Sequence, residues 1–411
     1  MALTRYSIPT KRQEEENIIM QKLTTNSADA IRTQHGNADL KEMVLQVYEN
    51  SDMSALSETL LLGFPSIERV KIICSRNVDN RNRIDRRFWE AIGYALVNLQ
   101  DLELANFSGD FPISSIALCL SQTDCRLERL LLHQIYFVSD DLEEDTAKLT
   151  EALRQHRHLK SFDLVGFFKS QQSEVSTGIC SSFIDGISAL PELEAVFVDS
   201  DRGLLDHGPF ERLCQSTSLR KLHLRDVNFK NDGNILVARA LEQNASLREL
   251  RLYNRQLQNR EVTAWFQILR THSSLEYFRL WTGYTTQTKN AELELARVLG
   301  NNTILKRCHF FHVNVGEEHV DRNGKAFAEM LENNTSLTNL TYSRCMTSLW
   351  WPKIKLYLEL NTKGRRRLAE QFDTITRSEW MNVLVDSSDN VNHLFHFIRM
   401  NPLLCQASTQ S

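Results

Sequence analysis

The sequence predicts an α/β repeat protein: a curved solenoid with parallel strands on its concave face and helices on its convex face. Three observations lead to this fold class. One apolar pattern, apolar-x-x-apolar-x-apolar, recurs along most of the chain, and helical patterns separate its copies. The 411 residues, 42% of them hydrophobic, also exceed what one compact core of roughly 250–300 residues holds.

The repeated pattern is clearest at Leu219, Leu222 and Leu224. Eleven copies fall between residues 40 and 345, and their first positions lie 26 to 34 residues apart. These first positions are Leu40, Ile67, Leu99, Leu127, Leu159, Leu193, Leu219, Leu247, Leu275, Leu305 and Leu337. One apolar triplet is a common pattern, but eleven copies in near-constant phase predict one short strand per unit.

Each unit is predicted to continue into a helix and a polar turn. Six residues before the first apolar position, eight units carry a large aliphatic residue: Leu61, Leu153, Ile187, Leu213, Leu241, Leu269, Leu299 and Leu331. Turns such as Asn244-Ala245-Ser246 follow, and we expect asparagine there because it tolerates the left-handed conformation that ends helices. No unit can bury its apolar face alone, so neighbouring units must stack.

This layout resembles the ribonuclease-inhibitor type of leucine-rich repeat over about three quarters of the chain. Gly233 and Leu241 fall where that family has its turn glycine and helix leucine. The family often places Asn or Cys nine residues into the unit, and Cys345 conforms. Equivalent positions in other units differ and include Phe107, Ile135, Phe167, Val227, Arg255 and Val313. The resemblance implies the leucine-rich-repeat fold and no specific activity.

Three segments are expected: a lead-in over 1–39, the repeat array over 40–345, and a C-terminal cap over 346–411. The lead-in is predicted to be partly disordered or a cap, with a short helix around Ile18 to Leu23. In the C-terminal segment, apolar residues alternate with polar ones from Ile354 to Leu360, which predicts a strand. A helix is predicted from about Ser378, and a last one from Val391 to Met400.

Residues between the repeated apolar positions should point to the concave side. In the N-terminal half these are acidic to mixed, as in Asp101, Glu103, Asp163, Val165, Phe197 and Asp199. Four later units instead combine cations and aromatics. The candidate binding residues are Lys221, His223, Arg225, Arg251, Tyr253, Tyr277, Arg279, Trp281, Arg307, His309 and Phe311.

These residues are predicted to form contiguous columns, because adjacent strands lie about 4.8 Å apart. One column reads Arg225, Tyr253, Trp281, Phe311, and the next reads His223, Arg251, Arg279, His309. Aromatic and arginine side chains dominate binding energy at interfaces. The alternative interpretation is cross-strand packing with solvated charge.

No motif in this sequence indicates catalysis or metal binding. It has no glycine-rich phosphate loop, no Gly-x-Ser-x-Gly and no His-Glu-x-x-His. Cys308, His309, His312 and His319 lie close in sequence, as zinc ligands can. The repeat frame directs Cys308 to the core and His309 to the concave face, and places the other two in the following loop. We therefore expect no enzyme activity, metal or cofactor.

The leading function is that of a scaffold or adaptor that binds a protein partner. The net charge of −4 gives no global reason to expect nucleic acid or a membrane surface. Residues 1–17 contain no signal-peptide pattern, no membrane-spanning run occurs, and the eight cysteines form no Cys-x-x-Cys. We expect a reduced cytoplasmic or nuclear protein.

Two alternative functions stay open. One is a regulator of a small GTPase, because Ran-type GTPase-activating proteins have similar repeats, although they usually carry a long acidic tail. The other is RNA or single-strand binding through the arginine and aromatic columns. The triplet Arg365-Arg366-Arg367 is interpreted as a solvated helix face or as a contact for phosphate or an acidic partner.

Overall fold

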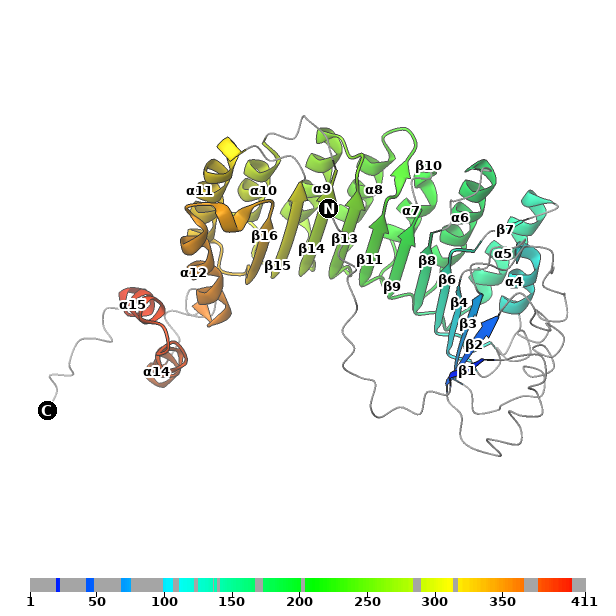
Figure 1. Ribbon diagram of the computed structural model, residues 1–411, viewed down its shortest axis with the longest axis horizontal. Helices are drawn as coiled ribbons and strands as arrows, with labels where there is room; N and C mark the ends of the chain where they lie inside the picture. The colour runs from blue at the N-terminus through cyan, green and yellow to red at the C-terminus, as the bar shows by residue number, and fades with distance from the viewer. Residues whose placement is uncertain are drawn as a thin grey trace, which may run out of the picture. The chain divides into compact units, whose positions relative to one another are not determined.

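The computed structural model describes the chain in segments. These are residues 20–22, 42–47, 68–74, 99–105, 111–121, 125–135, 137–138, 141–166, 173–200, 204–283, 290–312, 317–365 and 376–400. The chain divides into two compact units, Met1–Phe167 and Phe168–Ser411, which are described one at a time. Figure 1 labels most of the elements of both.

The first unit is a parallel sheet whose strands follow one another in chain order. Its strands are β1 (Met20–Lys22), β2 (Glu42–Val47), β3 (Arg69–Cys74), β4 (Asp101–Ala105), β6 (Arg129–His133) and β8 (Ser161–Val165). Helices α4 (Ile113–Leu120) and α5 (Leu142–Gln155) pack against each other, and β5 (Phe111–Pro112) pairs with β7 (Phe137–Val138). The predicted helix around Ile18 to Leu23 is wrong, because Met20–Lys22 pairs with β2 as a strand.

The second unit repeats the same order of strand and helix. Its parallel strands are β9 (Ala195–Asp199), β11 (Lys221–Arg225), β13 (Glu249–Asn254), β14 (Tyr277–Thr282), β15 (Arg307–His312) and β16 (Asn339–Tyr342). Its helices are α6 (Ser173–Ser188), α7 (His207–Cys214), α8 (Gly233–Glu242), α9 (Asn259–Thr271), α10 (Ala291–Leu299) and α11 (Glu317–Asn333). Two short strands, β10 (Leu204–Leu205) and β12 (Asn228–Phe229), pair with each other. In the chain, β10 lies between β9 and α7, and β12 lies between β11 and α8. Figure 1 shows α7 to α11 stacked along one face of these strands.

The buried core is the repeated apolar pattern itself. From the copy at Leu99 to the copy at Leu337, all three pattern positions are buried in every unit. The helix aliphatics six residues upstream are fully buried as well, from Leu153 to Leu331, and only Leu61 lies outside the described residues. Strand register explains why these positions are buried in every unit, because each pattern residue pairs with the same position on the next strand, as Leu222 pairs with Leu250. A parallel α/β repeat is therefore confirmed.

Close approach between repeats explains one glycine. A Cβ on Gly233, the first residue of α8, would lie 2.5 Å from the Cβ of Phe229 and 2.9 Å from that of His207. Real Cβ atoms do not approach so closely, so α8 can begin at this point only with a glycine.

Buried asparagines join successive turns of the second unit. The side chain of Asn334 donates to the carbonyls of Leu299 (2.7 Å) and Asn302 (2.8 Å) and accepts from the backbone of Leu337 (2.9 Å). Asn244 and Asn302 make equivalent contacts in their own turns. None of the three has a positive φ, so the expected left-handed role is wrong. Asparagine is needed here because one side chain both donates to and accepts from the buried backbone.

The C-terminal segment differs from its prediction in one element. Residues Trp351–Thr362 form helix α12, not a strand, after the short 3₁₀ helix η1 (Cys345–Thr347). Helices α14 (Arg377–Asp386) and α15 (Val391–Met400) follow and confirm the two predicted helices. Thr376 caps α14 and forms a capping box with Glu379.

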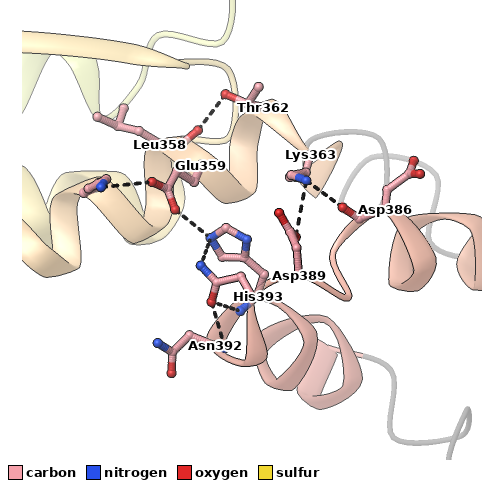
Figure 2. A network of polar contacts seen from close by, with 10 residues as sticks. Leu358, Glu359, Thr362, Lys363, Asp386, Asp389, Asn392 and His393 are labelled. Carbon is pink, nitrogen blue, oxygen red and sulfur yellow. Dashed lines mark hydrogen bonds and ion pairs between the residues drawn. The ribbon is translucent and has the colours of Figure 1, made fainter.

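Helices α14 and α15 dock on α12 through an apolar cluster of Leu360, Trp380 and Phe397. Polar contacts surround the cluster. Figure 2 shows Glu359 of α12 reaching α15, and Lys363, the residue after α12, reaching the end of α14 and the turn that follows it. Glu359 pairs with the buried His393 at 2.9 Å, and Lys363 donates to the carbonyl of Asp386 at 2.6 Å.

Candidate binding face

The candidate residues share one face of the second unit. We call it the open face: the side chains of β11, β13, β14 and β15 that alternate with the buried pattern residues. All eleven predicted residues lie on it. The two predicted columns are true register partners, since Arg225, Tyr253, Trp281 and Phe311 align from strand to strand. The column of His223, Arg251, Arg279 and His309 aligns in the same way.

The aromatic column is internally stacked. The rings of Tyr253 and Trp281 lie 4.0 Å apart with an interplanar angle of 3°. The guanidinium of Arg225 lies over Tyr253 at 5.4 Å, and that of Arg255 lies over Trp281 at 5.7 Å. Contacts of this kind contribute about 0.5–2 kcal/mol each and hold the side chains in fixed positions. Sequence reasoning missed Arg255, which follows β13 and lies outside the strand pattern.

Tyr277 is a platform and is not itself accessible. It is buried, with 7% of its surface exposed. The guanidiniums of Arg251 and Arg307 lie over its ring at 4.9 and 4.8 Å, and Arg279 lies over Phe311 at 5.8 Å. A ring between two guanidiniums orients them, so the predicted role of Tyr277 as a contact residue changes to a supporting one.

Two carboxylates on this sheet balance part of the positive charge. Glu249 accepts from His223 at 2.9 Å and pairs with Arg251 at 2.5 Å. Asp199 of β9 pairs with Arg225 at 3.5 Å. The sequence pattern placed Glu249 on this face but did not indicate that it neutralises Arg251, two residues along the same strand.

The pKa of His309 is sensitive to the burial and the positive charge around it. Burial and the nearby charges of Arg279, Arg307 and Arg251 lower the pKa of its imidazole. Burial, the larger cause, and repulsion by the three guanidiniums both favour the neutral form of the ring.

The face of the first unit is a network of matched charges. Lys71 pairs with Glu103 at 2.6 Å, and Arg129 pairs with Asp163 at 3.0 Å. A hollow of about 150 Å³ lies among these strands, and burial raises the pKa of Asp101 on its wall although Arg129 and Arg69 act in the opposite direction. Two of the acidic residues predicted there, Glu103 and Asp163, are thus paired with cations that the prediction did not weigh.

The residues considered for zinc are kept apart. Cys308 is buried in the core and His309 lies on the open face. His312 ends strand β15 and His319 lies in helix α11, so the expectation that both occupy the following loop is wrong. Within the described parts of the chain, no group of three or more His, Cys, Asp or Glu side chains could hold a metal ion.

Five of the cysteines are small core residues. Cys125, Cys180, Cys214, Cys308 and Cys345 are buried and form no disulfide. Burial raises the pKa of the Cys180, Cys214 and Cys308 thiols, which leaves them protonated and unreactive. Among the residues that the structure describes, no helix has the length and apolar character to span a bilayer.

Comparison with known proteins gives weak likenesses only. No protein-family model matches the chain, and no curated protein matches it. Actin-binding site 2 of leiomodin-1 matches with 19% identity and a TM-score of 0.32, over 41% of this chain and 96% of that one. A structure of the Rad7 and Elc1 complex in yeast matches with 13% identity and a TM-score of 0.38, over 79% and 83%. At these values neither likeness carries an argument about function.

Proposed function

We propose that this chain is a non-catalytic, leucine-rich-repeat protein of the ribonuclease-inhibitor type that binds a protein partner through the open face. One observation carries the proposal: arginine and aromatic side chains align in register across four adjacent strands. These residue types supply most of the binding energy at protein interfaces.

The internal stacking of the face supports binding more than it opposes it. Tyr253, Trp281 and Phe311 are already held in position but are only half-buried. A partner that covers them therefore gains apolar contact without immobilising free side chains, which lowers the entropic cost of association. A face of this kind left uncovered also carries a risk of aggregation, which favours a dedicated partner.

RNA or single-strand binding is the weaker candidate. Arginines beside aromatic rings favour it in general. On this face, however, Tyr253 and Trp281 are stacked on one another, so a base cannot insert between them without breaking that stack. Regulation of a small GTPase stays a prediction, which a GTP-hydrolysis assay tests.

The test is the double variant Trp281→Ala with Arg251→Ala. We expect it to fold and to lose about tenfold or more of the partner recovered from cell lysate by the wild type. The control, Leu204→Ala with Arg260→Ala, removes one exposed apolar side chain and one arginine elsewhere in the second unit. Equal recovery of the partner by wild type and by the open-face variant contradicts the proposal.

A further inference from the structure

Three arginines on the open face surround one neutral histidine. Arg279 is the register partner of His309, Arg251 is the register partner of Arg279 on the next strand, and Arg307 lies two residues before His309 on β15. Arg251 has Glu249 as its partner. Within the described residues, the guanidiniums of Arg279 and Arg307 form no ion pair or hydrogen bond, and each lies over an aromatic ring. Three cations and one anion leave a local excess of two positive charges.

The way these arginines are held leaves their donors available. A guanidinium stacked on a ring uses its flat face, while its N–H groups point outward in the plane. Phe311 supports Arg279 and Tyr277 supports Arg307 in this manner. Planar forks fixed in this way match anions with several oxygen atoms, to which they donate paired, charge-assisted hydrogen bonds.

We infer that this cluster binds a phosphorylated serine or threonine side chain of the protein partner, with Arg279 and Arg307 as its principal ligands and Arg251 beside them. The inference rests on the proposed function and names the chemistry of the partner. A phosphoryl monoester carries a charge of about −1.5 to −2 and three acceptor oxygens. It therefore matches the excess of two positive charges, whereas one carboxylate leaves half of it unbalanced.

The charge pattern favours a peptide over a nucleic-acid strand. A strand carries one charge per phosphate and needs a continuous basic track. Beyond the cluster, Arg225 pairs with Asp199, which interrupts the run of positive charge along the face. The rings of the neighbouring aromatic column are already stacked, and they offer a half-buried apolar surface to the residues beside the phosphate.

The experiment uses the full chain and degenerate peptide pools with a fixed central phosphoserine or phosphothreonine. Matched pools carry unmodified Ser or Thr, or Glu, and fluorescence polarisation measures binding. The phosphorylated pool is expected to bind about tenfold or more tightly than either matched pool, and Arg279→Gln with Arg307→Gln is expected to lose that gain. The control, Arg260→Gln with Arg297→Gln, removes the same formal charge from helices α9 and α10.

A second measurement reads the site directly. Phosphoserine is titrated into protein with labelled histidines, and NMR follows the imidazole of His309. An anion between the arginines offsets their charge, so the pKa of His309 is expected to rise in the wild type and to stay unchanged in the Arg279→Gln, Arg307→Gln variant.

Three results would overturn the inference: equal binding of the phosphorylated and Glu pools, unchanged binding by the Arg279→Gln, Arg307→Gln variant, or tighter and steeply salt-dependent binding of a single-stranded RNA. Phosphatase treatment separates this failure from that of the proposed function. If the wild type still recovers its partner after phosphatase while the Trp281→Ala, Arg251→Ala variant does not, protein binding stands and the phosphoryl inference fails.

Discussion

At the scale of single residues, His272 stands where neighbouring repeats carry asparagine. It is buried, its Nδ1 accepts from the backbone of Ser274 at 3.3 Å, and its Nε2 has no hydrogen-bond partner among the described residues. Burial lowers the pKa of His272 to about 4. Asn302, one repeat later, uses the same position to donate to the carbonyl of Leu269. The histidine therefore occupies an asparagine site without making the contact to the preceding repeat.

The variant His272→Asn should weaken the dependence of stability on acid. Because the folded pKa of about 4 lies below the unfolded value of 6.5, the unfolded chain binds more protons between these values. Stability due to neutral His272 is complete above pH 6.5 and is lost as the pH falls toward 4. Between pH 7 and pH 5 the wild type should lose ~2 kcal/mol more than the variant, measured by urea unfolding at both pH values.

The reciprocal variant Asn302→His serves as the control. It places a histidine in the equivalent turn one repeat later, where we expect it to add an acid-dependent loss of similar sign. If His272→Asn shows the full wild-type slope of unfolding free energy against pH, protonation of His272 does not govern that slope. The other histidines with a pKa of about 4, the buried His156 and the half-buried His396, are then the groups to examine.

At the scale of the element, one turn joins two repeats through one side chain. Asn334→Ala removes two donated and three accepted hydrogen bonds, and the buried backbone N–H groups of Ser336 and Leu337 lose the acceptor that Asn334 supplies. We expect a loss of about 3 kcal/mol or more in the free energy of unfolding. The adjacent Asn333 is exposed, so Asn333→Ala should change stability by no more than about 0.5 kcal/mol. Similar losses for both variants in chemical denaturation would show that helix propensity, and not the turn, is responsible.

The same elements show why parts of this fold could be predicted. Each repeated apolar residue packs beside the apolar residue at the same position of the next repeat. The spacing of apolar residues within a repeat and the pairing between repeats therefore predict the same buried positions. In α12, Ile354 and Leu358 fit a period of two, but together with Asn361 they also fit the i, i+4, i+7 spacing of a helix. Periodicity alone could not decide, and Pro352 in the first turn was the available signal for the helix.

The columns of the open face could be predicted from the sequence, but the ion pairs that balance its charge could not. Columns follow from strand register, which the repeat fixes once Leu222 and Leu250 are aligned. Ion pairing depends on side-chain rotamers, so the sequence did not reveal that Glu249 takes up Arg251 and leaves Arg279 without an acid. That difference between two arginines in one column is what localises the excess charge.

At the scale of the molecule, α12 follows the last strand of the second unit and makes the contacts that a further repeat would make. Asn361 donates to the carbonyls of Asn334 (3.0 Å) and Leu337 (2.8 Å), as Asn334 does to the turn before it. The buried Arg365 donates to the carbonyl of Leu331 at 2.9 Å, at the end of α11. The last repeat is thereby covered on the side where no further strand follows among the described residues.

In such an array, a destabilising substitution should affect the neighbouring repeat most and more distant repeats less. Asn361→Ala removes the contacts of α12 to the last turn, so hydrogen exchange should quicken most in α11 and β16 and little in β9 and β11. Trp380→Ala cuts the cluster on the outer side of α12 and should quicken exchange in α14 and α15 while α11 stays protected. Mass spectrometry of exchanged peptides measures both patterns. Equal acceleration from β9 to β16 in Asn361→Ala would mean that the second unit unfolds as one block, because only nearest-neighbour coupling produces a gradient.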